Sequence, residues 1–252
     1  MVIIKKEKIQ NIPILHVVKH ENVDAKLPFI VFIHGISSIK ERNIQYAYML
    51  AEQGYRVILP DALYHGERYE EKNVYSEFWG IVLTTIREIE VLKESFDDRC
   101  LIEDGRIGLA GTSMGAIITL GAMSRYDWIN TAVSLMGNPA YINFAKFQLK
   151  IMEQNNIKIP LTNEQIEEQL NMLKEYDATN DLSKWNYRPL MFWHGKRDTT
   201  VPYEGAYHFY EQLKPTYEQK EIPISFILDE QAGHVVPNKG AIETVNWFVK
   251  HL

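Results

Sequence analysis

The sequence has 252 residues, of which 46% are hydrophobic and 24% are charged, a composition that allows one sizeable globular core. The formal net charge is −6, and the most basic cluster is the short KKEK at residues 5–8, which argues against a nucleic-acid partner. A single cysteine, Cys100, excludes an internal disulfide framework and gives no metal-ligand pattern.

The sequence also lacks the signals of a membrane protein. The first ten residues, MVIIKKEKIQ, contain no apolar core of a signal peptide. No apolar run approaches the length of about 18 residues that a membrane-spanning helix needs. We therefore expect a soluble cytoplasmic protein with no membrane partner, whose oligomeric state the sequence does not indicate.

Short apolar runs alternate along the chain with longer segments of helical spacing. The run at 28–34 is so continuously apolar that both faces of its strand should be buried. Together, the patterns predict strands at 12–19, 28–34, 55–60, 106–111, 131–137, 189–195 and 223–228, and helices at 42–54, 73–95, 114–124, 204–214 and 239–251. This alternation predicts one α/β domain over residues 1–252, with a mostly parallel sheet and helices on both faces.

Residues 139–187 break this rhythm, because they separate two strands by far more than one crossover helix requires. They contain two stretches of helical pattern, at 144–154 and 163–176. So long a connection in a compact domain usually carries function, and we expect a small helical cap over the carboxyl edge of the sheet. An apolar substrate pocket is one interpretation of Phe144, Phe147, Met152 and Met172, but packing is the favoured one.

A lone serine lies between two glycines in the stretch Gly111-Thr112-Ser113-Met114-Gly115, where a predicted strand gives way to a predicted helix. Glycine is unfavourable in both elements, so this placement needs a reason. A G-x-S-x-G sequence in a strand-to-helix turn is typical of a nucleophile elbow, which exposes the serine hydroxyl at the edge of the sheet. The pattern predicts Ser113 as a nucleophile.

A serine hydroxyl needs a base to take its proton and a third group to orient that base. His234 follows the last predicted strand, and Asp198 follows the strand at 189–195. The chain order Ser113, Asp198, His234 is the order used on this type of sheet, so we predict these three as the catalytic residues. Asp229 and Glu230 are rival acids, but their closeness to His234 in the chain favours a role in capping the loop.

Two N–H groups should stabilise the negative charge that develops on the carbonyl oxygen. We expect them to be those of Met114, next to the nucleophile, and Ile36, in the loop after the strand at 28–34. His34 is expected mainly to hold that loop. His65 and Arg68 are candidates for contact with the substrate, although an equally good interpretation has Arg68 bracing its own loop through Glu67, Glu70 or Asp61.

These motifs, HGISS, PDALYHGER, GTSMG, HGKRDTTVP and QAGH, resemble in order the loops of the α/β-hydrolase superfamily over essentially the whole chain. More narrowly, the chain resembles bacterial serine esterases grouped with dienelactone hydrolase and prolyl-oligopeptidase-like enzymes. The dienelactone branch uses a cysteine nucleophile, whereas this chain has Ser113, so lactone activity is not implied. The resemblance implies hydrolysis of carboxylic esters through an acyl-enzyme, without a cofactor or metal.

The sequence therefore predicts a carboxylesterase that acts on small or short-chain acyl esters. The same catalytic residues would also serve a peptidase or amidase, a thioesterase or an acyltransferase. The alternative from a different class is a chain that keeps the fold only to bind a ligand, but a binding module has no use for a complete set of nucleophile, base and acid.

Overall fold

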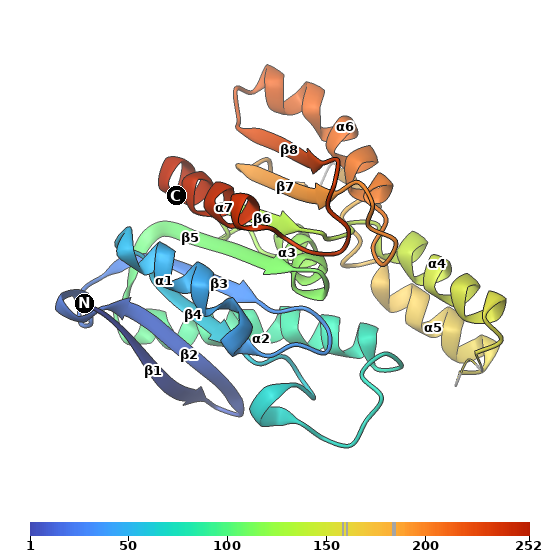
Figure 1. Ribbon diagram of the computed structural model, residues 1–252, viewed down its shortest axis with the longest axis horizontal. Coiled ribbons are helices and arrows are strands. Elements are labelled where there is room, and N and C mark those ends of the chain that lie inside the picture. The colour runs from blue at the N-terminus through green and yellow to red at the C-terminus, as the bar shows by residue number, and fades with distance from the viewer. Residues whose placement is uncertain (158, 160, 183–184) are drawn as a thin grey trace.

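The computed structural model describes residues 1–157, 159, 161–182 and 185–252. Its described strands form one eight-stranded sheet in the order β1-β2-β4-β3-β5-β6-β7-β8 (Figure 1). The strands from β4 to β8 in this order are parallel, whereas β1–β2 and β2–β4 pair antiparallel. The bounds are β1 Val2–Ile9, β2 Ile12–Lys19, β3 Leu27–Ile33, β4 Arg56–Pro60, β5 Ile102–Thr112, β6 Thr131–Leu135, β7 Leu190–Gly195 and β8 Ile224–Asp229.

Helices cover both faces of this sheet, as the alternating pattern predicts (Figure 1). Helices α1 and α7 pack with one apolar cluster, and α2, α3 and α6 contribute to the cluster on the opposite face. Within the described ranges, no helix is long and apolar enough to cross a bilayer. The bounds are α1 Ile44–Glu52, α2 Phe78–Asp98, α3 Met114–Arg125, α4 Tyr141–Gln154, α5 Asn163–Leu173, α6 Glu204–Gln219 and α7 Asn238–His251.

Strand β1 is absent from the elements that the sequence predicts. It lies at the edge of the sheet and pairs antiparallel with β2, for example at Ile4 opposite Val17. Its central residues Ile4, Lys5 and Lys6 are exposed, and apolar and polar residues do not alternate along the strand. Lysines on an edge strand discourage pairing with another chain. The same lysines interrupt the alternating pattern by which a strand is recognised in a sequence.

The long connection between β6 and β7 contains α4 and α5, which confirms its two predicted helices. Helix α5 begins at a capping box, in which Thr162 and Gln165 each bond the backbone N–H of the other. In Figure 1 the two helices lie side by side, beyond the carboxyl ends of the parallel strands. That this segment acts as a cap over an active site stays a prediction.

Candidate active site

The turn between β5 and α3 holds Ser113 in an unusual backbone conformation. Its φ is 54° and its ψ is −117°, a region that side-chain-bearing residues rarely adopt and that often marks a functional site. Glycine is required on both sides: a Cβ at Gly111 would lie 2.3 Å from the carbonyl carbon of Gly115, and one at Gly115 would lie 2.1 Å from the Ile33 carbonyl oxygen. The predicted strand-to-helix elbow is therefore present, and its glycines permit the tight packing of the turn.

The structure brings together the three residues that the sequence places on separate loops. The Ser113 hydroxyl lies 2.8 Å from Nε2 of His234, and Nδ1 of His234 lies 2.7 Å from Oδ2 of Asp198. These distances fit a hydroxyl that donates to Nε2 and an Nδ1–H that donates to the carboxylate. Ser113 and Asp198 are 9% and 5% exposed, whereas 26% of the His234 side chain is exposed, so the imidazole lies at the open side of the group.

The Asp198 carboxylate is held in place by more than the imidazole. Its Oδ1 accepts the backbone N–H groups of Thr200 and Val201 at 2.9 and 3.0 Å. Burial acts to raise the pKa of the Asp198 carboxyl, but hydrogen bonds from His194, His234 and the Val201 N–H outweigh it and hold the pKa well below its ordinary value. The carboxylate is thus ionised and oriented toward His234 at neutral pH.

The loops that carry the acid and the base are tied directly to each other. The Lys196 N–H donates to the carbonyl oxygen of Asp229 at 2.8 Å. A Cβ at Gly195 would lie 2.3 Å from the carbonyl oxygen of Gly233, so glycine at the end of β7 allows the two loops to pack closely. This contact fixes the residue before His234 against the loop of Asp198.

The rival acids have other partners. The carboxylate of Asp229 accepts the N–H groups of Gln231 and Ala232 at 3.0 and 3.1 Å, which is the loop-capping role expected from its position. Glu230 forms an exposed ion pair with Lys196 at 2.8 Å. Neither carboxylate takes the place of Asp198 beside the imidazole.

The loop after β3 lies directly against the nucleophile. A Cβ at Gly35 would be 3.3 Å from Cβ of Ser113 and 3.9 Å from its hydroxyl oxygen. Among the hydrogen bonds of the described residues, neither the Ile36 N–H nor the Met114 N–H has a protein acceptor. Two donors next to the hydroxyl are thereby left for an oxygen that is not part of the protein.

His34 holds this loop, as the sequence suggests. Its Nδ1 bonds the carbonyl oxygen of Gly35 at 2.7 Å, and its Nε2 lies 3.1 Å from the N–H of Ala62. Because an N–H needs an acceptor, Nε2 carries no proton and Nδ1 is the donor. Complete burial lowers the pKa of the His34 imidazole to about 4, which keeps this neutral form at neutral pH.

His65 also connects these two loops. It belongs to the loop after β4 and bonds the loop after β3, whereas His34 bonds from the loop after β3 to the loop after β4. Its Nε2 accepts the N–H of Ser37 at 3.0 Å, and its Nδ1 bonds the carbonyl oxygen of Leu63 at 2.8 Å. Burial lowers the pKa of His65 as well. Both ring nitrogens are therefore engaged by backbone groups, which favours holding the loop over the predicted contact with substrate.

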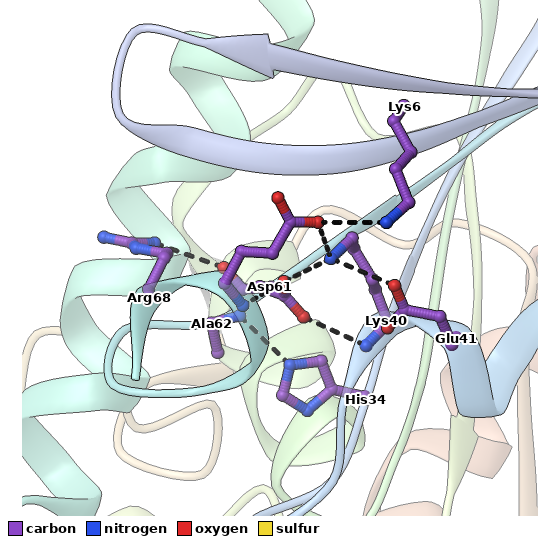
Figure 2. Close-up of polar contacts among 8 residues, drawn as sticks. Lys6, His34, Lys40, Glu41, Asp61, Ala62 and Arg68 are labelled. Atoms are coloured by element: carbon purple, nitrogen blue, oxygen red, sulfur yellow. Dashed lines mark hydrogen bonds and ion pairs between the residues drawn. The ribbon is translucent and has the colours of Figure 1, made fainter. Parts of the chain in front are cut away.

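A partly buried ion cluster, which the sequence does not predict, completes this connection (Figure 2). The Lys40 ammonium group contacts carboxylates of Asp61 at 2.5 Å, Glu67 at 2.7 Å and Glu41 at 3.2 Å. The Lys40 N–H also donates to Asp61 at 3.1 Å. We call the hydrogen bonds between residues 34–40 and 61–67 the loop clamp. In the sequence, Asp61 is noticeable because it directly follows a buried strand. That position does not identify Lys40, which is 21 residues away, as its partner.

Arg68 is also engaged within the protein. Its guanidinium donates to both carboxylate oxygens of Glu88, on α2, at 2.8 and 2.7 Å, and to the Asp61 carbonyl oxygen at 3.2 Å (Figure 2 shows the bond to Asp61). The structure thus favours the bracing interpretation, with a partner other than the carboxylates that the sequence suggests. Contact of Arg68 with substrate stays a prediction.

Phe144 lies mainly in the core. It is 4% exposed, and its ring packs edge-on against those of Phe78 and Trp79 on α2. It also borders an open hollow between α4 and α6. Met172 is 50% exposed, so the four apolar residues singled out in this segment do not form one stripe.

Comparisons with known proteins agree with this architecture. The model of the prolyl oligopeptidase family matches residues 43–252. The Bacillus subtilis protein named "Putative esterase YitV" is 44% identical over 100% of both chains, and Esterase YjfP of Escherichia coli is 30% identical, again over 100% of both. The crystal structure of TT1662 from Thermus thermophilus has a TM-score of 0.75 at 19% identity and covers 100% of both chains.

The matched region contains the serine turn between β5 and α3 and the loops after β7 and β8. It also contains the strands of the sheet from β4 to β8 in chain order. The extent of the match and the full-length identity to two relatives exceed what a shared fold alone requires. The chain belongs to the prolyl oligopeptidase family and has the α/β-hydrolase fold.

Proposed function

We propose that the protein is a serine esterase that hydrolyses carboxylic esters through an acyl-enzyme. The observation that carries this proposal is the position of His234, within hydrogen-bond distance of the Ser113 hydroxyl on one side and of the Asp198 carboxylate on the other. The names of the two full-length relatives, "Putative esterase YitV" and "Esterase YjfP", support the choice of reaction.

The geometry supports a definite role for each group. Nε2 of His234 takes the proton as the Ser113 oxygen attacks the ester carbonyl, and later returns it to the leaving alcohol. Asp198 keeps the proton on Nδ1 and stabilises the charged imidazolium that forms during the attack. A water molecule, activated by the same imidazole, then releases the acid from Ser113.

The Ile36 and Met114 N–H groups supply the remaining stabilisation. Neither N–H has a protein acceptor among the described residues; Met114 follows the nucleophile, and Ile36 follows Gly35, which lies against Ser113. Such a donor contributes about 3 kcal/mol to the transition state in enzymes of this type. Met114 is also the first residue of α3. The positive end of the helix dipole therefore adds to the stabilisation that its N–H group supplies.

Peptide or amide hydrolysis is the second candidate, because the family that the chain belongs to is the prolyl oligopeptidase family. The same nucleophile and base would serve an amide. Ester hydrolysis is favoured because both relatives of 30% identity or more are named esterases. An acetyl anilide and the corresponding phenyl ester, compared under the same conditions, distinguish the two reactions.

The test is hydrolysis of p-nitrophenyl acetate by Ser113→Ala. Loss of the nucleophile should lower kcat by about 10⁴-fold or more. Ser124→Ala is the matched control, since this serine is on α3, the helix that Ser113 precedes, and bonds backbone carbonyls instead of the imidazole. Near-normal turnover by Ser113→Ala, with an unchanged circular dichroism spectrum, would contradict the proposal.

A further inference from the structure

A cavity of about 390 Å³ lies between the beginning of α2, helices α4 and α5, and the loop after β7. Its size is within the range of sites that enclose small molecules. Its walls are mostly apolar and include Phe147, Met152, Ile166 and Leu170. The segment at 139–187, for which the sequence predicts a helical cap, therefore supplies most of the apolar wall of this cavity.

Two parts of the lining adjoin residues of the candidate active site. Thr199 and Thr200 line it, and they directly follow Asp198, whose carboxylate accepts the Thr200 N–H at 2.9 Å. On another side Tyr75 lines it, and the Tyr75 hydroxyl accepts a hydrogen bond from Ser37 at 3.3 Å. Ser37 follows Ile36 in the loop that lies against Ser113. The cavity thus borders the loop of Asp198 directly, and one hydrogen bond connects its wall to the loop of Ile36.

The lining restricts what the cavity can hold. No charged side chain is among the described residues that line it. The side-chain oxygen of Gln148, one of the few polar groups in the wall, already accepts the indole N–H of Trp79 at 3.0 Å. Since an ion would lose its hydration there without gaining a partner, the cavity fits an uncharged, apolar group.

The position of His234 decides which half of an ester enters. Nε2 of His234 must return its proton to the leaving alcohol, so the alcohol lies next to this imidazole. None of residues 233–236 contributes to the described lining of the cavity, and Val235 is 60% exposed. The alcohol side therefore faces the open surface, and the cavity is left for the acyl side.

We propose that this cavity is the acyl-binding site and that it selects esters with an apolar acyl group of medium length, such as octanoate. This inference rests on the proposed esterase function and deepens it. An acyl chain attached at Ser113 would enter between the acid loop and the loop of Ile36 and contact Phe147 and Leu170. The preferred chain is then longer than the short chains that the sequence analysis expects.

The experiment is a series of p-nitrophenyl esters from acetate through butyrate and octanoate to palmitate. Each buried methylene contributes to discrimination, so kcat/KM for octanoate should exceed that for acetate by about tenfold or more. Leu170→Trp fills the cavity from α5 and should remove this preference, so that kcat/KM for octanoate falls to about that for acetate. Met172→Trp, on the same helix but 50% exposed, is the matched control.

Ile166→Trp provides a second filling variant if Leu170→Trp lowers the melting temperature. A wild-type protein that prefers acetate, or variants that lower both esters equally, would overturn the acyl assignment. A preference that follows the alcohol in alkyl acetates and disappears in Leu170→Trp would assign the cavity to the leaving group instead. Failure of the esterase proposal is distinct, because no ester of the series would then be hydrolysed in a Ser113-dependent way.

Discussion

The polar loops around Ser113 and the apolar wall formed by α4 and α5 are held together by different forces. Hydrogen bonds at 2.7–3.1 Å orient the groups of the first region, where Asp198 and His34 each have backbone partners that fix one conformation. The second region consists mainly of side-chain packing, as in the contact of Phe144 with Trp79. Directional bonds fix the reacting atoms, whereas a volume enclosed by apolar side chains selects a substrate by size.

The first way to test this contrast is Asp198→Asn, for which we expect the largest effect. The amide keeps the shape but presents an N–H where the imidazole needs an acceptor, so the wrong tautomer of His234 is favoured. We expect kcat to fall by about 10⁴-fold, as in related catalytic groups. Asp229→Asn, on the neighbouring loop, should change kcat little in the same assay; equal losses in both variants would contradict the assignment.

The loop clamp should contribute mainly to stability. Lys40→Met leaves the completely buried Asp61 carboxylate without its cation, and we expect the free energy of unfolding to fall by about 3–5 kcal/mol. Urea denaturation measures this change, with the exposed Lys5→Met as control. A loss no greater than that of the control would show that the buried pair does not hold the loops.

Acid should weaken the same region through His34. Its pKa is about 4 in the folded protein and about 6.5 when unfolded, so the unfolded chain binds a proton first as the pH falls. The stability contribution is complete above about pH 6.5 and is lost progressively toward about pH 4, by up to about 3 kcal/mol. Urea denaturation of His34→Gln should show a shallower pH dependence than the wild type; identical slopes would contradict this account.

His65→Gln should have a smaller effect on catalysis. The variant weakens the bond to the Ser37 N–H and lets the neighbouring Ile36 donor shift, which we expect to lower kcat by about tenfold to hundredfold. KM should change less than kcat, because the donor acts mainly on the developing charge. His20→Gln, at an exposed position, is the control, and a variant that raises only KM would instead indicate direct contact of His65 with substrate.

The residues that could be predicted from the sequence are those placed by the parallel sheet. Ser113, Asp198 and His234 each follow a recognisable strand, and the carboxyl ends of parallel strands share one edge. That topology alone brings distant loops together, so order in the chain was enough to nominate the three side chains. Their distances required the structure.

The rest depended on pairings that leave no local pattern. Lys40 and Asp61 resemble ordinary surface residues in the sequence, yet both are buried because each neutralises the other. Arg68 selects Glu88 on α2 over nearer carboxylates, and only the packing of that helix determines this. The cavity likewise depends on how α4 and α5 pack against α2, which their separate helical patterns do not specify.

The central claim is that His234 activates Ser113, and labelling with a fluorophosphonate tests it most directly. Peptide mass spectrometry locates the label, and the rate of labelling is compared between the wild type and His234→Ala. We predict a label on Ser113 and a rate at least about 100-fold lower in the variant. A label on another residue, or equal rates in the two proteins, would contradict it.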